Sequence, residues 1–173
     1  MRAHPTSRMT SPDQSGATSL SPQPFAYRNL PMLLLRARER LMVRFRPILS
    51  AHGLTEQPWR VIRALNEQGP MESRHVASLC TISTPSLVGI LVRMQRAGLV
   101  RKSHVARDRR RVIVTLTPRS VRLIRNIAGE LQAVYIELER TLGHATLMAA
   151  YEAVDALLGD MESRVDPDRI RSR

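Results

Sequence analysis

The stretch from Ser83 to Thr117 constrains the fold most, because it joins a well-delimited helix to a strongly basic segment. Ser83 is a favoured N-cap residue, and Pro85 suits the first helical turn, where a missing N–H costs little. Gly98 is a favoured residue just after a helix end. These signals predict a helix over residues 83–97.

The predicted helix has two unlike faces. One face carries apolar residues at i, i+4 and i+7, which would pack on a core: Leu87, Leu91 and Met94. The opposite face is small and polar at its beginning and basic near its end: Ser86, Gly89, Arg93 and Arg96. A helix whose first turns enter a DNA major groove and whose later residues meet phosphates needs this pattern.

The segment after this helix reads as two strands joined by a basic tip. Residues 99–104 and 112–116 are strand-like, and residues 106–111 between them are too polar to be buried. One acid, Asp108, stands among six basic residues: Arg101, Lys102, Arg107, Arg109, Arg110 and Arg111. Such a tip can lie along phosphates or insert an arginine into a narrow minor groove, and Asp108 can orient a neighbouring arginine. A solvated arginine-rich loop is the alternative for the segment alone.

The charge of the whole chain agrees with a polyanionic partner. A net charge of +12 and a pI of about 11.5 favour nucleic acid or an anionic membrane surface. The regular alternation of caps, breaks and apolar stripes argues against a membrane-surface helix. No apolar run is long enough to span a membrane, and no signal-peptide stretch opens the chain. We therefore expect a cytoplasmic protein.

No constellation of residues indicates catalysis. Acids are few and scattered, and no glycine-rich phosphate loop occurs. The histidines share no ligand spacing: His4, His52, His75, His104 and His144. We predict that the chain is not an enzyme and needs no metal or other cofactor. Cys80, the only cysteine, is expected to fill space beside Leu79 rather than to sense peroxide.

The rest of the chain predicts long helices on both sides of the basic module. Residues 1–28 lack any period and read as a disordered tail, and residues 163–173 read as a frayed end. Between them we expect helices over 31–50, 55–67, 73–80, 118–142 and 144–161, with a short strand at Met71-Glu72. Thr55 and Thr117 are the expected caps, and the helix over 73–80 would turn Val76, Ala77 and Leu79 inward.

These helices imply a division of labour within one domain over residues 29–162. A DNA-binding lobe would cover about 54–117, and dimerisation helices would cover about 31–50 and 118–162. The flanking helices carry more apolar surface than a small domain needs, which predicts a second copy as partner. A two-fold dimer would place two recognition helices about one DNA turn apart on a pseudo-palindromic site.

Three motifs resemble those of MarR-type bacterial regulators: R-A-G-L-V (Arg96–Val100), D-R-R (Asp108–Arg110) and V-T-L-T (Val114–Thr117). Within that family, two further segments are similar to regulators of homoprotocatechuate (hydroxyphenylacetate) degradation: L-T-E-Q-P-W-R at 54–60 and P-S-L-V-G-I-L-V-R-M at 85–94. The resemblance implies a mainly α fold with a small β-hairpin wing, a winged helix-turn-helix with long N- and C-terminal dimerisation helices. It also implies a homodimer that binds double-stranded operator DNA, by default as a repressor.

The resemblance also implies roles for individual residues at the DNA. Thr84, Ser86 and Gly89 fall on the recognition helix where bases and phosphates are contacted, with Arg93 following. Members of the family often have Arg or Lys in place of Gly89, so specificity here shifts toward the wing and DNA shape. Arg110 matches the wing arginine that enters the minor groove, and Asp108 matches the residue that orients this arginine. Three further residues are assigned to phosphate contacts: Arg107, Arg109 and Arg111.

MarR-type proteins commonly bind small aromatic acids in a cleft between the dimer helices and the DNA-binding lobe. An aromatic carboxylate needs apolar walls and a fixed cation. The candidates are Arg36, Arg40, Phe45, His52, Trp59 and Arg63, of which Trp59 is a core residue or also a cleft wall. The similar sub-family implies a hydroxyphenylacetate-type effector and control of aromatic catabolism genes. The alternatives are a regulator of another phenolic or stress response, or a basic nucleic-acid-binding protein without effector.

Overall fold

The computed structural model describes residues 27–105 and 108–164. Arg107 and most of both predicted tails lie outside the described residues. The elements follow one another as α1 (Leu30–Ala51), α2 (Glu56–Gln68), β1 (Met71–Glu72), α3 (Ser73–Leu79), α4 (Thr84–Arg96), β2 (Val100–Val105), β3 (Asp108–Leu116), α5 (Pro118–Leu142) and α6 (His144–Arg164). The predicted mainly α fold with a small hairpin wing is confirmed.

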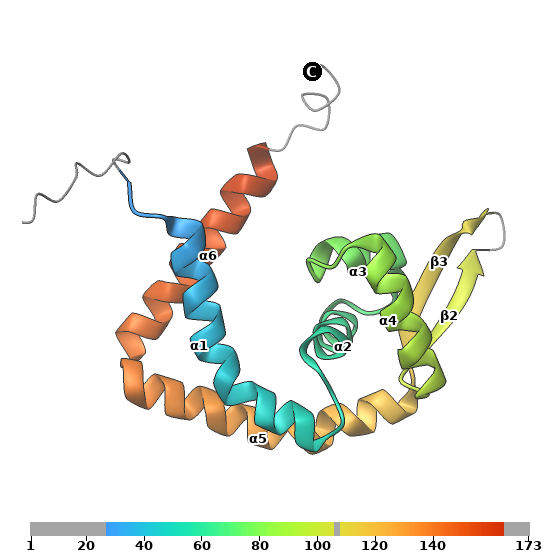
Figure 1. Ribbon diagram of the computed structural model, residues 1–173, viewed down its shortest axis with the longest axis horizontal. Coiled ribbons are helices and arrows are strands. Elements are labelled where there is room, and N and C mark those ends of the chain that lie inside the picture. Colours follow the sequence, from blue (N-terminus) through green and yellow to red (C-terminus); the bar gives the residue numbers. More distant parts are fainter. Residues whose placement is uncertain (1–26, 106–107, 165–173) are drawn as a thin grey trace, which may run out of the picture.

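The elements form a lobe and an arm (Figure 1). The arm consists of α1 and α6, and the long helix α5 joins it to the lobe. Helix α5 runs along the base of the molecule, from the hairpin at one end to α6 at the other. Helix α1 packs on α5, and α6 rises from the far end of α5 on the same side as the first turns of α1. Helices α2, α3 and α4 and the hairpin make up the lobe at the opposite end.

Capping residues set several helix boundaries. Ser83 accepts a hydrogen bond from the Ser86 amide at 3.4 Å, and Thr117 accepts one from the Ser120 amide at 3.3 Å. Gly98 has φ +67°, and the amide after it donates to the Met94 carbonyl, which is the Schellman ending of α4. Thr55 occupies the N-cap position of α2, but its side chain makes no capping hydrogen bond.

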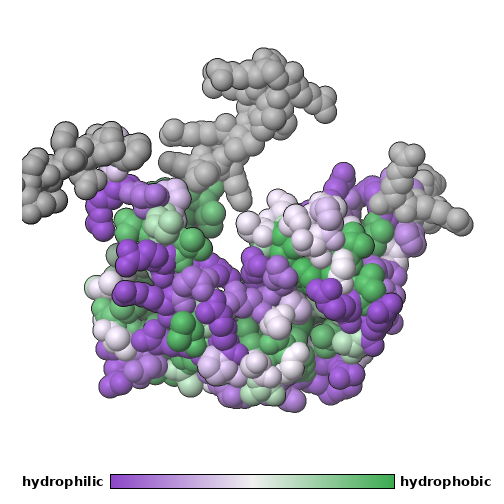
Figure 2. Space-filling view, viewed as in Figure 1, coloured by the Kyte–Doolittle hydropathy of each residue, from purple (hydrophilic) through white to green (hydrophobic). Residues whose placement is uncertain are grey.

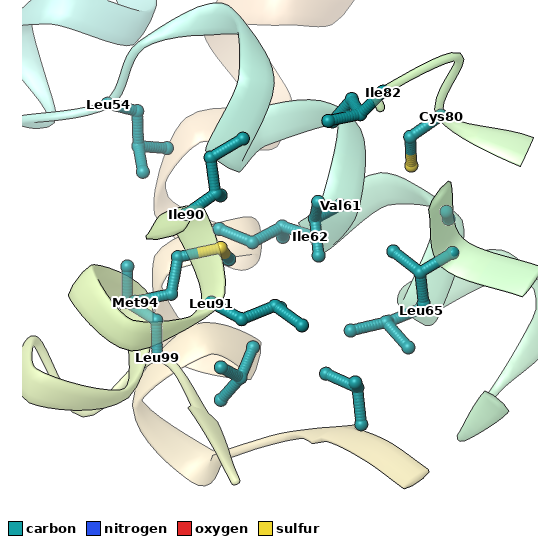
Figure 3. Close-up of a cluster of buried hydrophobic side chains, with 14 of the residues drawn as sticks. Leu54, Val61, Ile62, Leu65, Cys80, Ile82, Ile90, Leu91, Met94 and Leu99 are labelled. Atoms are coloured by element: carbon teal, nitrogen blue, oxygen red, sulfur yellow. The ribbon is translucent and has the colours of Figure 1, made fainter. Parts of the chain in front are cut away.

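The core of the lobe lies where α2, α3, α4 and the sheet meet (Figure 3). Its side chains are apolar and fully or nearly buried: Leu54, Val61, Ile62, Leu65, Val76, Leu87, Ile90, Leu91, Met94, Leu99, Val100 and Val114. The predicted inward stripe of α4 is therefore confirmed. The inward placement of Leu79 was wrong: it is 43% exposed. Val76, Ala77 and Cys80 fill the buried side of α3, which leaves Leu79 on its open side.

The three strands form an antiparallel sheet in the order β1-β3-β2. The predicted short strand at Met71-Glu72 is confirmed, and it pairs with β3 through Met71 and Val114. The prediction that all of residues 106–111 form a loop was wrong, because β3 begins at Asp108 and pairs there with Val105. A ribbon that extends beyond the lobe keeps such polar residues in solvent while their backbones pair.

No single helix in the described ranges is long and apolar enough to cross a membrane. Helices α3 and α4 pass that test only as a pair, by length and composition, and they are bent by 111° relative to each other.

Candidate nucleic-acid interface and adjoining cleft

Helix α4 presents a short polar surface at its N-terminus. Ser83, Thr84 and Ser86 are all exposed there, and the Ser83 hydroxyl donates to the Ser86 hydroxyl at 2.8 Å. The buried stripe of α4 fixes the helix against α2 and the sheet, so this polar end projects from a rigid support. Small hydroxyl side chains on a projecting helix end suit entry into a major groove.

Gly89 provides space for an arginine from the next turn. A Cβ atom added at Gly89 would lie 3.5 Å from Nη1 of Arg93, so the guanidinium of Arg93 lies back over Gly89. The Arg or Lys that the resemblance leads one to expect at this position is absent, but Arg93 brings a guanidinium to the same part of the helix surface. Sequence reasoning missed the neighbouring Val88, which is 57% exposed on this helix. An exposed valine there can contact a thymine methyl group.

The wing is formed by β2 and β3. The backbones of Arg109 and Arg110 lie in β3, whereas their side chains, like all of Arg107, lie outside the described residues. Asp108 is exposed at the beginning of β3. The predicted roles of Arg107, Asp108, Arg109 and Arg110 at the DNA thus stay predictions.

Arg111 has a protein partner that the sequence did not reveal. Its Nε donates to Oε1 of Glu72 at 2.8 Å, and its Nη2 contacts the same oxygen. Arg74 at the start of α3 contacts the other oxygen, Oε2, at 2.8 Å. Because it pairs with Arg111 of the wing and with Arg74 of α3, Glu72 links the wing to the first helix of the helix-turn-helix. Its side chain is only 16% exposed. The hydrogen bonds from Arg111 hold the pKa of Glu72 below its ordinary value, against a smaller opposing effect of desolvation.

This pairing predicts a pH-dependent contribution to stability. Because the pKa of Glu72 is lowered in the folded state, its contribution is present above the unfolded pKa of about 4.5 and is lost as the pH falls through the folded pKa. Glu72→Gln should therefore lower the free energy of unfolding at pH 7, and the difference from the parent protein should shrink below about pH 4. Urea denaturation across this pH range measures it. A difference that grows on acidification would contradict the pairing.

The turn between α3 and α4 contains the only described non-glycine residue with positive φ, Thr81 at 50°. Its amide donates to the Ser78 carbonyl and the Ile82 amide donates to the Ala77 carbonyl, which is the Schellman pattern that Gly98 forms after α4. For a β-branched residue this conformation costs about 1–3 kcal/mol. Immediately before it, the Cys80 carbonyl accepts a 2.7 Å hydrogen bond from Nη1 of Arg60.

Cys80 itself is buried in this turn. Burial raises the pKa of its thiol, although the positive charge of Arg60 acts in the opposite direction. A thiol kept protonated is a poor nucleophile toward peroxide, in agreement with the predicted packing role.

A cleft lies between the helix-turn-helix and the helices of the arm. It consists of a cavity of about 100 Å³ and a hollow of about 340 Å³ that share Met42, Trp59, Arg63 and Tyr135. Phe45 and Leu131 complete the smaller space, and the larger one reaches Arg60 and Cys80. Figure 2 shows the surface notched between the arm and the lobe. We call these two spaces together the effector cleft, because the sequence predicts an effector site between the dimerisation helices and the DNA-binding lobe.

The walls of the effector cleft combine aromatic rings with a cation. The rings of Phe45 and Tyr135 are 5.2 Å apart at 59°, a tilted aromatic pair. Desolvation raises the pKa of Tyr135 from an ordinary value that already leaves the hydroxyl protonated at neutral pH, so the hydroxyl can donate a hydrogen bond. Arg63 forms an ion pair with Glu67 one turn later on α2 and remains about half exposed. Apolar walls, one hydroxyl and the guanidinium groups of Arg38, Arg60 and Arg63 suit a small aromatic carboxylate, although Glu56 and Glu67 also line the larger space.

The predicted effector residues divide into two groups. The structure brings Phe45, Trp59 and Arg63 together, and Trp59 is a half-buried cleft wall. Arg36 and Arg40 are exposed on α1 and line neither space of the effector cleft. His52 lies elsewhere, with its Nε2 2.7 Å from Oε1 of Glu130 on α5.

Sequence reasoning missed most of the residues that line the effector cleft, among them Arg38, Met42, Arg60 and Tyr135. Met42 and Tyr135 lie in helices that the sequence analysis assigns to dimerisation, and Arg38 lies on the same predicted helix as the candidates Arg36 and Arg40. Their convergence depends on how α1 and α5 pack against α2, which no local signal in the chain specifies.

Glu56 anchors α1 to the beginning of α2 beside the cleft. It accepts a 2.5 Å hydrogen bond from Nε of Arg46 and also contacts Arg38, and both arginines contact Glu39. Desolvation acts to raise the pKa of Glu56, but the hydrogen bonds from Arg38 and Arg46 outweigh it and leave the pKa lowered. This network fixes the α1 wall of the cleft relative to α2. In the described part of the chain no three potential metal ligands lie together.

Comparisons with known proteins agree with this geometry. The sequence model of the MarR family matches residues 52–111. The HTH-type transcriptional regulator FarR of Neisseria gonorrhoeae is 40% identical over 115 residues, which are 66% of this chain and 79% of that protein. The homoprotocatechuate degradative operon repressor of Escherichia coli is 39% identical over 111 residues, 64% of this chain and 75% of that protein.

A solved structure of a relative resembles the whole described fold. The crystal structure of NadR in complex with 4-hydroxyphenylacetate has a TM-score of 0.71 and 35% sequence identity, and covers 79% of this chain and 97% of that one. These relatives regulate transcription, which confirms that the chain is not an enzyme. The chain belongs to the MarR family of DNA-binding transcriptional regulators.

Proposed function

We propose that this regulator is a cytoplasmic repressor that binds a pseudo-palindromic operator as a homodimer and leaves it when a small aromatic carboxylate of the 4-hydroxyphenylacetate type binds. The observation that carries the proposal is the effector cleft, where Trp59, Tyr135 and Arg63 converge beside the helix-turn-helix. The relative NadR is bound to 4-hydroxyphenylacetate, and another relative represses a homoprotocatechuate degradative operon.

At the operator, Thr84, Ser86 and Arg93 would contact bases and phosphates from α4, with Gly89 leaving room for the Arg93 guanidinium. The wing residues Arg107, Arg109 and Arg110 would follow the adjacent backbone and minor groove, with Asp108 orienting Arg110. For Arg111 we propose a positioning role in place of the phosphate contact, because its guanidinium is held by Glu72.

The dimer would form through the apolar surface that the arm leaves uncovered. Helix α6 exposes Tyr151, Val154, Leu157 and Leu158 along one side, and α1 exposes a longer series: Leu30, Met32, Leu34, Leu35, Leu41 and Val43. Exposed apolar side chains in this number on two helices of one chain indicate a protein partner, and a two-fold copy matches a palindromic operator.

In the cleft, the carboxylate would pair with Arg63, the hydroxyl of Tyr135 would donate to the ligand, and the ring would lie against Trp59 and Phe45. Repression ends if the ligand favours a conformation whose recognition helices no longer match the half-site spacing.

Arg63→Ala should weaken the binding of 4-hydroxyphenylacetate. A hydrogen bond to a charged group contributes about 1.5–3 kcal/mol, so we expect the Kd to rise by roughly 10- to 150-fold. Isothermal titration calorimetry measures it. The matched control is Arg36→Ala, which removes an exposed arginine of α1 outside the cleft and should leave the Kd unchanged. Equal losses in both variants would place the ligand elsewhere, and no binding to the parent protein would leave a regulator of another response.

A further inference from the structure

Arg60 lies between the effector cleft and the helix-turn-helix and contacts both. Its Nη1 donates a 2.7 Å hydrogen bond to the carbonyl oxygen of Cys80, the C-cap residue that follows α3. The same side chain lines the larger space of the effector cleft with its neighbours on α2, Trp59 and Arg63. One guanidinium therefore extends from the cleft wall to the turn that precedes the recognition helix.

The turn that Arg60 supports is conformationally strained. Thr81 adopts a positive φ that glycine tolerates without cost, as Gly98 does in the corresponding turn after α4. The carbonyl immediately before Thr81 is one of those that a helix end leaves without a helical partner, and Arg60 supplies the donor. Two backbone hydrogen bonds within the turn and one from a residue outside it, Arg60, therefore hold the turn.

The guanidinium of Arg60 also has an unused donor. Its Nε is buried and makes no hydrogen bond to any atom of the described residues. A buried donor without a partner is unfavourable, so a movement of the side chain that brings Nε to a carboxylate in the cleft would be favourable. Since the guanidinium is a rigid plane, an acceptor that draws Nε toward it also moves Nη1.

We propose that Arg60 is the positioning residue that couples the effector cleft to the recognition helix. A carboxylate in the cleft attracts the guanidinium, and the hydrogen bond to the Cys80 carbonyl breaks. The turn at Thr81 then relaxes, and α4 leaves the orientation that fits the operator. This coupling rests on the proposed function for its ligand, but the support of the turn by Arg60 does not.

The first test measures operator affinity without ligand, by fluorescence anisotropy on the full-length protein. Arg60→Gln should weaken operator binding about tenfold, within the usual range of coupling between sites. Thr81→Gly removes the strain, so the double variant Arg60→Gln/Thr81→Gly should recover most of that loss, and Arg60→Lys should lie between the parent and Arg60→Gln. If the two substitutions act additively, the turn does not depend on Arg60 and the proposal is wrong.

The second test measures the ratio of operator affinities with and without saturating 4-hydroxyphenylacetate. In the parent protein we expect a ratio above about fivefold, and in Arg60→Gln a ratio near one while the ligand still binds by calorimetry. A normal ratio in Arg60→Gln would overturn the coupling even if ligand affinity fell. A parent protein that ignores the ligand would refute the proposed effector, and the first test would then decide the role of Arg60 alone.

Discussion

Ser86→Glu will abolish specific operator binding without destabilising the protein. Ser86 is exposed at the third position of α4, three residues after the N-cap Ser83. A glutamate there completes a capping box with Ser83 and favours the helix. The same carboxylate would face the phosphates and acceptor edges of the major groove, and like-charge contacts of this kind cost several kcal/mol. We expect operator affinity to fall by at least about 100-fold.

The matched control is Ser86→Gln, which offers the same capping geometry without the charge. It should keep measurable affinity for operator DNA, and both variants should melt at or above the temperature of the parent protein. Anisotropy with labelled operator and thermal unfolding by circular dichroism measure the two quantities. Operator affinity retained by Ser86→Glu would exclude α4 as the recognition helix.

Leu158→Asp will separate the dimer and thereby remove tight operator binding. Leu158 is 56% exposed on α6, so in a single chain the charge would remain in solvent. In a dimer the same carboxylate would be buried against a second copy, which is strongly unfavourable without a partner charge. Loss of the second recognition helix removes an avidity gain of about 10²- to 10⁴-fold at a two-half-site operator.

Analytical ultracentrifugation and binding to full-site and half-site DNA test this expectation together. Half-site affinity should stay unchanged, whereas full-site affinity should fall to the half-site value. Glu152→Gln, an exposed substitution on the same helix, is the control and should remain dimeric. A Leu158→Asp protein that sediments as a dimer would show that α6 does not form the interface.

Local signals in the chain specified most of the fold. Ser83 and Thr117 cap their helices, Gly98 ends α4, and the apolar period of α4 selects its buried face. Each of these features is decided by a few neighbouring residues, so the sequence alone predicts it. The tip of the hairpin was harder, because the pairing that begins β3 at Asp108 is a contact between strands rather than a local preference.

The effector cleft depends on packing between elements distant in sequence. Residues of α1, α2, α5 and the end of α3 line it, and the rotation of α1 against α2 decides that Met42 and Arg38 face inward whereas Arg36 and Arg40 face solvent. A helical stripe predicts which residues share a face but not which partner that face meets. The same reason explains why Leu79, on an apparently inward stripe, lies on the open side of α3.

Charge pairing at the wing was also invisible in the sequence. Glu72 and Arg111 are far apart in the chain and meet only because β1 pairs with β3. A run of arginines therefore suggested that each one was available to phosphates, whereas the sheet assigns one of them to a carboxylate. The predicted roles of Arg107, Arg109 and Arg110 stay predictions.

The most direct measurement is binding to a DNA fragment from the region upstream of the protein's own gene, at moderate salt with excess competitor DNA, with and without 4-hydroxyphenylacetate. We predict specific binding that survives the competitor and is released by the acid. Specific binding that neither this acid nor related aromatic acids affect would retain the regulator and reject the effector. Binding that the competitor removes completely would contradict sequence-specific operator recognition, the central claim.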